Sequence, residues 1–138
     1  MKILIVEPEI KGHFLSLYVR NVIKSLKNQQ IYLLTSKEIR NSNVLNLLKK
    51  DYPKLKILIT DELIYSKNKN PLILFFFQFL NFLNIKKKIN LFNISYKFDH
   101  IFFTNFDHFD KILCLYKNPF NFCNFSGILV NPRVHQFY

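Results

Sequence analysis

The sequence predicts an α/β protein with a Rossmann-like, mainly parallel sheet of about five strands flanked by helices. Residues 2–7 and 31–36 are short apolar runs rich in β-branched side chains, which is typical of strands covered by helices on both faces. Between them lie a glycine and a stretch with apolar residues at helical spacing. This strand–helix–strand order is that of a parallel βαβ unit with a right-handed crossover.

Composition and length bound the class of protein. The chain has 138 residues, the length of one domain, so we expect a single domain over residues 1–138. Hydrophobic residues make up 49% of it, which is enough for a packed core. The formal net charge of +11 favours an anionic partner. The excess is mostly lysine, however, whereas phosphate and base recognition favours arginine, so codon bias toward lysine is the simpler explanation.

The remaining elements follow from hydrophobic periodicity and from helix and turn signals. Ser36 is the expected N-cap of the second helix, and Val44, Leu47 and Leu48 are its expected buried face. The polar segment 61–70 is expected to be a loop. Helices are predicted over residues 13–27, 37–50, 71–85 and 109–116, and further strands over residues 56–60, 99–104 and 125–130.

The predicted helix over residues 71–85 is strongly apolar but too short for a membrane span. Gln78, Asn81 and Asn84 recur every three residues and are expected to form one polar stripe. Lys86, Lys87 and Lys88 follow directly. One interpretation is a helix that lies on an anionic membrane, with its phenylalanines in the lipid and its lysines on the headgroups. The other is a helix packed into the core or against another domain.

The first candidate site lies after the first strand. Parallel sheets of this kind place ligands at the carboxyl ends of their strands, where this chain has Glu7, Gly12 and His13. A glycine there lets backbone N–H groups approach an anion at a helix N-terminus, and His13 could hydrogen-bond a hydroxyl or a phosphate. The alternative is a glycine needed only for the turn, with His13 capping its helix.

The second candidate site lies after the fourth predicted strand, at the same edge of the sheet. Asn105 is a candidate substrate-binding residue, and Asp107 and His108 are candidates for acid/base catalysis or for binding sugar hydroxyls. Equally, Asn105 or Asp107 could cap the next helix. His100 lies inside a strand and is expected to be structural, while His135 follows the fifth strand without other support.

Several classes of site are missing from the sequence. Cys114 and Cys123 lack the spacing of a metal site, and neither a P-loop, a GxSxG elbow nor an HExxH motif occurs. We expect no metal and no cofactor bound by this chain alone. The basic, aromatic stretch 86–97 lacks an RNA-binding pattern, so nucleic acid is not the expected partner. Reduced thiols and the lack of a signal peptide predict a cytoplasmic protein, with peripheral contact to the inner face of the membrane if the helix over residues 71–85 binds lipid.

Five segments together resemble a known family. The chain looks like the N-terminal, acceptor-side half of GT-B glycosyltransferases, which have two Rossmann-like domains and use nucleotide-sugar donors. Members often open with a strand ending in Glu-Pro, a Gly-His loop and a long helix, followed by a strand ending in Leu-Thr-Ser. The matching segments here are residues 1–8, 12–15, 33–36, 101–107 and 125–133.

This resemblance implies transfer of a sugar from a nucleotide-sugar co-substrate to a hydroxyl acceptor. Gly12 and His13 would face the cleft, and His108 would contact the donor sugar. The family's donor-binding residues belong to a second domain that these residues do not contain, so the chain is expected to be a truncated half that is inactive until a partner domain completes it. The alternative function is a non-enzymatic basic α/β module that binds an anionic membrane or RNA.

Overall fold

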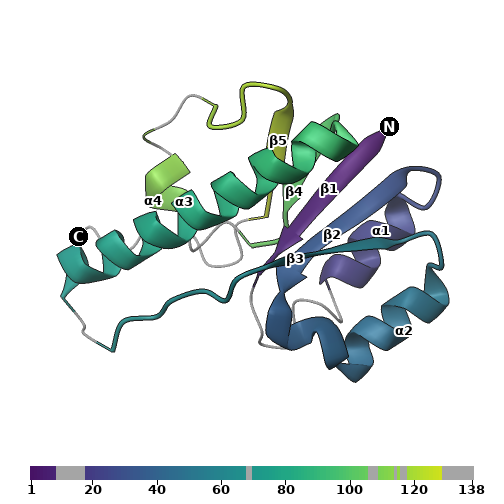
Figure 1. Ribbon diagram of the computed structural model, residues 1–138, viewed down its shortest axis with the longest axis horizontal. Coiled ribbons are helices and arrows are strands. Elements are labelled where there is room, and N and C mark those ends of the chain that lie inside the picture. Colours follow the sequence, from purple (N-terminus) through teal and green to yellow (C-terminus); the bar gives the residue numbers. More distant parts are fainter. Residues whose placement is uncertain (9–17, 68–69, 106–108, 114, 116–117, 129–138) are drawn as a thin grey trace.

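The computed structural model describes residues 1–8, 18–67, 70–105, 109–113, 115 and 118–128 (Figure 1). In these ranges the chain forms one sheet whose strand order is β3-β2-β1-β4-β5, and every neighbouring pair is parallel. The predicted α/β, Rossmann-like fold is therefore confirmed. The strands are β1 (Lys2–Glu7), β2 (Gln30–Ser36), β3 (Lys56–Thr60), β4 (His100–Phe103) and β5 (Asn124–Gly127).

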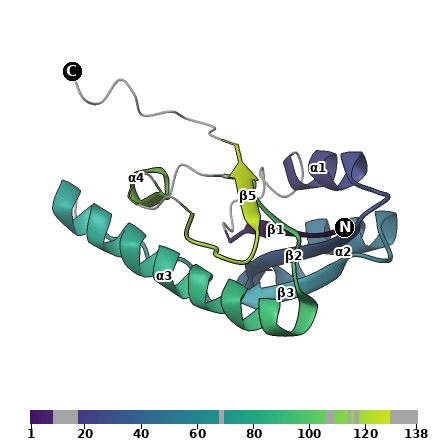
Figure 2. The same ribbon diagram turned by 90° about the horizontal axis from the view of Figure 1, so that it is seen from above.

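The helices cover both faces of this sheet. Figures 1 and 2 show α1 and α2 on one face and the long α3 crossing the other. Short crossovers place β2 and β3 on one side of β1, and the chain then returns through α3 to place β4 on the other side. The helices are α1 (Arg20–Ser25), the 3-10 helix η2 (Lys37–Asn41), α2 (Asn43–Asp51), α3 (Pro71–Tyr96) and α4 (Asp110–Leu113).

Alternation along the strands gives two separate cores. Successive side chains of a strand point to opposite faces, so Leu4 and Val6 contact the α3 layer while Ile3 and Ile5 contact the α1/α2 layer. The α3-side core adds the helix residues Phe82, Ile85 and Ile89, and the other core adds Val19, Ile23, Leu45 and Leu48. Burial on both faces explains why the polar residues of β1 and β2 are confined to the strand ends, with Lys2 and Gln30 at the amino ends and Glu7, Thr35 and Ser36 at the carboxyl ends.

The predicted helix over residues 37–50 is wrong in its start and in one residue of its buried face: Leu48 is buried and Val44 is partly buried against the core, but Leu47 is exposed. Ser36 makes no capping hydrogen bond, and residues Lys37–Asn41 form a 3-10 helix. The α-helix starts only after Ser42, whose extended backbone interrupts the run and whose side chain accepts a hydrogen bond from the Leu45 N–H at 3.2 Å. This phase buries Leu45 and Leu48 and leaves Leu47 exposed.

The long helix α3 extends further than predicted. It continues through the three lysines to Tyr96, because lysine is a good helix former and no breaker occurs before Lys97. Asn70 caps its start by accepting from the Leu72 N–H. Lys97 ends it in the left-handed region, with φ 53°. Lys86, Lys87 and Lys88 therefore lie inside the helix rather than after it.

The predicted polar stripe on α3 is also wrong, because its three residues have different surroundings. Asn81 is buried, and its side chain accepts from the Ile64 N–H and donates to the Ile64 carbonyl, both at 2.9 Å. Asn84 is exposed and Gln78 is half-buried. A spacing of three residues drifts around a helix of 3.6 residues per turn, so the three side chains leave one common face.

The other predicted elements differ from the structure mainly at their ends. The strand predicted over residues 56–60 is confirmed as β3, and the loop prediction holds for the described residues of 61–70. The strands predicted over residues 99–104 and 125–130 are found as the shorter β4 and β5. In the described part of the first predicted helix, residues 18–19 are π-helical and α1 covers Arg20–Ser25, while α4 covers Asp110–Leu113.

The Asn81 contact gives the first testable prediction. Changing Asn81 to leucine keeps the branched shape of the side chain but leaves the N–H and carbonyl of Ile64 without these partners. We expect the free energy of unfolding to fall by about 1–3 kcal/mol in urea denaturation. The matched control, Asn84→Leu, lies on the exposed side of the same helix and should change it by less than about 0.5 kcal/mol. Equal effects of the two changes would show that the Asn81 contact does not hold the 61–67 segment against α3.

Candidate functional site

Polar residues end four neighbouring strands of the sheet, at its carboxyl edge. All of them are buried, in contrast to the solvent-exposed polar residues usual at strand ends. The edge includes the switch point between β1 and β4, where the chain direction along the sheet reverses and where open α/β sheets bind ligands. We call these residues the polar row: Thr60 of β3, Thr35 and Ser36 of β2, Glu7 of β1, and Thr104 and Asn105 after β4.

The polar row divides between the two faces of the sheet. Glu7 and Thr35 are register partners on β1 and β2, and they follow Ile5 and Leu33 of the α1/α2-side core by two residues. Ser36 and Thr60 are register partners on β2 and β3 and follow Leu34 and Leu58 of the α3-side core in the same way. Hydroxyl groups are thus available on both sides of the same edge.

The Thr104 hydroxyl donates a short hydrogen bond to the Glu7 carboxylate across the switch point. It also lies 3.2 Å from the Val6 carbonyl oxygen, which accepts from the Thr104 N–H as well. These contacts continue the pairing of β1 with β4 beyond Phe103. Glu7 is fully buried, with 0% of its surface exposed. Its contact with Thr104 therefore fixes the carboxyl ends of β1 and β4 relative to each other beneath the molecular surface.

Thr35 and Ser36 present the least satisfied groups of the polar row. Each hydroxyl oxygen is buried and finds no hydrogen-bond partner among the described residues. A buried polar group without a partner costs roughly 1–3 kcal/mol, so such a group is an unusual feature of a native fold. A further hydrogen-bonding group would therefore gain the most binding free energy at these two oxygens.

An acidic pair stands on the rim above β2 and β3. Glu38 of η2 and Glu62, just after β3, are both exposed. The pKa of Glu38 is raised above its ordinary value of 4.5, chiefly by a side-chain hydrogen bond with Glu62, then by desolvation and by the negative charge of Glu62. Protonation of Glu38 lets the two carboxyl groups share a proton instead of repelling each other.

The structure describes part of the predicted site. Glu7 and Asn105 lie at the same carboxyl edge, on β1 and directly after β4, as predicted from their places in the sequence. Gly12, His13, Asp107 and His108 lie outside the described residues, as do Cys114 and His135. Thr104 is the first residue of the second predicted site, the segment 104–108. Sequence reasoning missed Thr35 as a site residue, although a short hydroxyl side chain directly ends an apolar strand there.

Two other titratable residues, His100 and Cys123, have structural surroundings rather than a place in the polar row. His100 Nε2 lies 2.8 Å from the Ser126 hydroxyl oxygen, a cross-strand contact between β4 and β5. Burial, with a smaller contribution from Asp99, raises the pKa of the Cys123 thiol to about 11. Cys123 therefore stays protonated at neutral pH and is a poor nucleophile. Among the described residues no group of three or more His, Cys, Asp and Glu side chains could hold a metal ion.

The lysine triplet lies in the middle of α3, with Lys86 and Lys88 half-buried. Lys88 Nζ lies 3.4 Å from an Asp61 carboxylate oxygen, and Lys87 is exposed. None of the described helices combines the length and the apolar character needed to span a bilayer.

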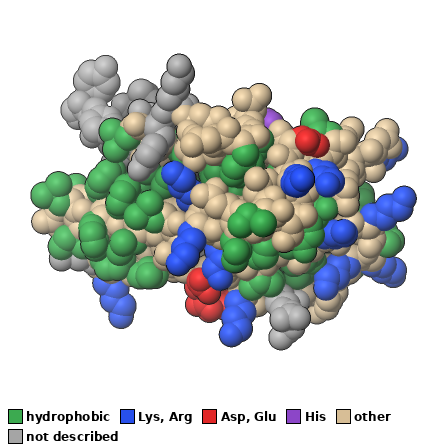
Figure 3. Space-filling view, turned by 45° about the horizontal axis from the view of Figure 1, so that its top comes forward, with side chains coloured by type: hydrophobic (Ala, Val, Ile, Leu, Met, Phe, Trp, Pro, Cys, Tyr) green, Lys and Arg blue, Asp and Glu red, His purple; other side chains and the backbone are tan. Residues whose placement is uncertain are grey.

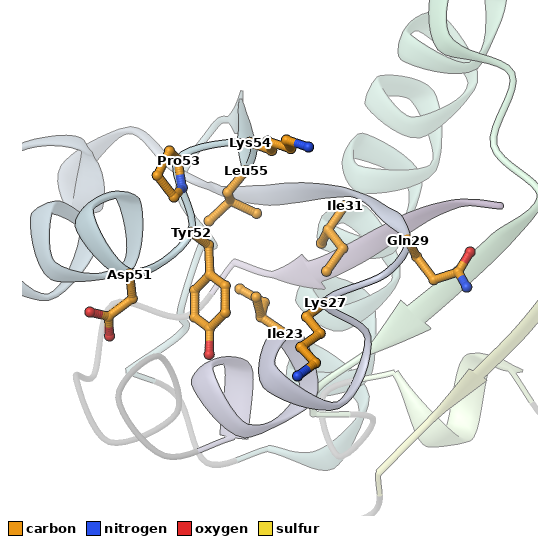
Figure 4. A pocket seen from close by; sticks show the side chains of 9 residues that line it. All are labelled: Ile23, Lys27, Gln29, Ile31, Asp51, Tyr52, Pro53, Lys54 and Leu55. Atoms are coloured by element: carbon orange, nitrogen blue, oxygen red, sulfur yellow. The ribbon is translucent and has the colours of Figure 1, made fainter.

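A hollow of about 320 Å³ opens at the opposite, amino edge of the sheet (Figure 4). It lies between the C-terminal ends of α1 and α2, with Ile23, Ile31 and Leu55 as its apolar floor and Tyr52 and Lys27 on its sides. Arg20 and Asp51 pair at 2.8 Å beside it. Because parallel α/β sheets bind ligands at the carboxyl edge, this hollow does not coincide with the predicted site.

Comparisons with known proteins give no further assignment. The chain matches no protein-family model, and no curated protein is significantly similar to it. The class that the fold defines is therefore a Rossmann-like α/β protein with a polar carboxyl edge.

The raised pKa of Glu38 predicts that removing its carboxyl group increases thermal stability at high pH but not at low pH. Because its pKa is raised in the folded state, its stabilising contribution is complete below the ordinary value of 4.5 and is lost as pH rises through the folded pKa. A glutamine amide at this position would donate to Glu62 at every pH, so Glu38→Gln should raise the melting temperature slightly at pH 8 and not at pH 4. Thermal unfolding across this range measures it. A difference that grows toward acid pH would refute the assigned contact.

Proposed function

We propose that the chain is the acceptor-side domain of a glycosyltransferase of the GT-B type. It would bind a sugar or other hydroxyl-rich ligand at the polar row and would work with a second domain that holds a nucleotide-sugar donor. The observation that carries this proposal is the pair of buried hydroxyls of Thr35 and Ser36 without described partners, beside the Glu7–Thr104 contact.

The chemistry of the polar row suits a sugar. Sugar hydroxyls both donate and accept, so they can pair with threonine and serine hydroxyls and with a carboxylate, directly or through a bridging water. The Glu7 carboxylate, held by Thr104 at the switch point and wholly buried, would orient the strand ends beneath the ligand rather than contact it. A phosphate fits this position less well, because the row contains one carboxylate and no arginine or lysine.

The strand order supports the same location. With β1 between β2 and β4, the crossovers leave on opposite faces, and open α/β sheets of this kind bind ligands beyond the carboxyl ends of such strands. Glu7 and Thr104 lie at the ends of the two strands on either side of this switch point. Catalysis in such an arrangement would rest on positioning the acceptor and on stabilising the leaving diphosphate, which the second domain would contact.

The Thr35 hydroxyl provides a test that separates function from folding. In Thr35→Val a buried hydroxyl without a described partner becomes a methyl group, so the free energy of unfolding should rise or stay unchanged. Ligand binding should weaken about five- to tenfold, the size of one lost hydrogen bond. Saturation-transfer NMR with glucose, galactose, mannose, N-acetylglucosamine and nucleotide sugars measures the binding, and urea denaturation measures the stability.

The matched control is Gln29→Ala at the amino-edge hollow, which should leave sugar binding unchanged. Saturation of sugar protons that is lost in Gln29→Ala and kept in Thr35→Val would place the ligand at the wrong edge and contradict the proposal. The same conclusion follows if no member of the panel binds the wild-type chain.

If a second domain holds the nucleotide-sugar donor, this chain alone should show no glycosyltransferase activity. Incubation of the purified chain with nucleotide sugars should release no nucleoside diphosphate above the rate without protein, because the donor-holding residues would belong to the second domain. A coupled diphosphate assay measures this release. Turnover by the chain alone would contradict the assignment to the acceptor side.

A further inference from the structure

The outward side of α3 carries a row of exposed apolar side chains. Leu72, Phe76, Leu83, Leu91 and Ile94 are 79%, 56%, 39%, 59% and 75% exposed. At about 100° per residue they fall within an arc of roughly 100°. The buried Phe82, Ile85 and Ile89 lie on the opposite side of the helix, against the sheet. We call the five exposed residues the outer row.

The N-terminal half of α3 also extends past the sheet. Figures 1 and 2 show it running beyond the carboxyl ends of the strands. No residue of the first ten of the helix is buried, and the first buried one is Asn81. Phe75 and Phe79 are half-buried against the core, while Leu72 and Phe76 face away from it. Packing on the sheet therefore does not account for the apolar character of this half.

Positive charge borders the outer row. The helix contains Lys86, Lys87 and Lys88 and no acidic residue. Consecutive residues lie about 100° apart, so Lys86 and Lys88 flank the outer row on its two sides and Lys87 lies within it. The space-filling view shows hydrophobic side chains gathered toward the overhanging end of the molecule, with basic side chains next to them (Figure 3).

We propose that the outer row docks onto an anionic lipid surface, with α3 lying in the plane of the interface. Leucine and phenylalanine side chains would enter the acyl boundary, and the lysines would extend their amines to the headgroups. This surface offers both an apolar phase and negative charge, which the outer row and its lysines need together. The proposal is independent of glycosyl transfer and would equally serve a non-enzymatic module.

Other occupants fit the charge pattern less well. A second copy would bring together two chains of net charge +11 and two lysine triplets. In an antiparallel pair of α3 helices centred on Leu83, each Lys87 would face the apolar row of the other copy. RNA would satisfy the lysines but would leave Leu72, Phe76 and Ile94 without a partner.

The test is flotation of the full chain with vesicles of phosphatidylcholine alone or with about one-third phosphatidylglycerol, at low and high salt. The wild-type chain should float only with the anionic vesicles, and high salt should weaken this. Leu72→Ser with Phe76→Ser should lower the partition coefficient at least about tenfold, because two apolar side chains no longer enter the lipid. Both residues are exposed, so circular dichroism should show an unchanged fold.

Two triple variants separate local from overall charge. Changing Lys86, Lys87 and Lys88 to glutamine should lower the partition coefficient by roughly 100-fold or less. The matched control changes Lys49, Lys50 and Lys54, exposed residues on and after α2, to glutamine, which alters net charge equally and should have little effect. Equal losses in both triples, or no loss in the serine variant, would overturn the proposal, as would absence of flotation with anionic vesicles.

Gel filtration and RNA binding complete the test. If the wild-type chain elutes as a dimer and the Leu72→Ser, Phe76→Ser variant as a monomer, the outer row is a self-association surface and the lipid proposal fails. Binding of a polyuridylate RNA at the affinity seen for vesicles, unaffected by the serine changes, would likewise assign the lysines to a different partner.

Discussion

Burial of β1 on both faces is the constraint on which the rest of the fold depends. Leu4 and Ile5 are wholly buried, yet they point to opposite faces, so an apolar layer must cover each side of the sheet. The α1/α2 layer meets one requirement with short helices, and α3 meets the other together with Phe109, Ile112 and Phe120. Because the two layers need crossovers of the same hand, β4 returns to the free side of β1 and creates the switch point.

The same constraint explains where polar chemistry appears. Polar side chains cannot occupy the middle of β1 or β2 without facing a packed layer, so they collect where the strands end. Parallel alignment then brings those ends to one edge, which places Glu7 beside Thr35 and Thr104 although Thr104 is 97 residues away in the sequence. The polar row thus follows from topology, whereas the hydroxyls of Thr35 and Ser36, which find no partner among the described residues, are not explained by packing.

The sequence predicted the strands and their parallel order well, because continuous apolar runs such as residues 2–7 permit few alternatives. It predicted the helix ends poorly. Ser36 and Ser42 are both reasonable caps, and only tertiary packing of Ile39 and Leu45 selects the second. In the polar row, Glu7 and Asn105 were predicted from their places at the carboxyl ends of apolar strands. Thr35 was not, because its significance lies in burial without a described partner, which depends on residues distant in the sequence.

The helix α3 shows the same limit and connects the two proposals. It is apolar on nearly every side, so periodicity could not indicate which face packs on the sheet, and the buried Asn81 looked like a solvent-facing residue. The outer row is defined by the packing of Phe82, Ile85 and Ile89 against β1 and its neighbours, which the sequence does not show. The overhanging half of α3 extends past the carboxyl ends of the strands, the edge that holds the polar row. A lipid surface docked along it would therefore lie beside the proposed ligand edge, which favours an acceptor that is itself carried in the membrane.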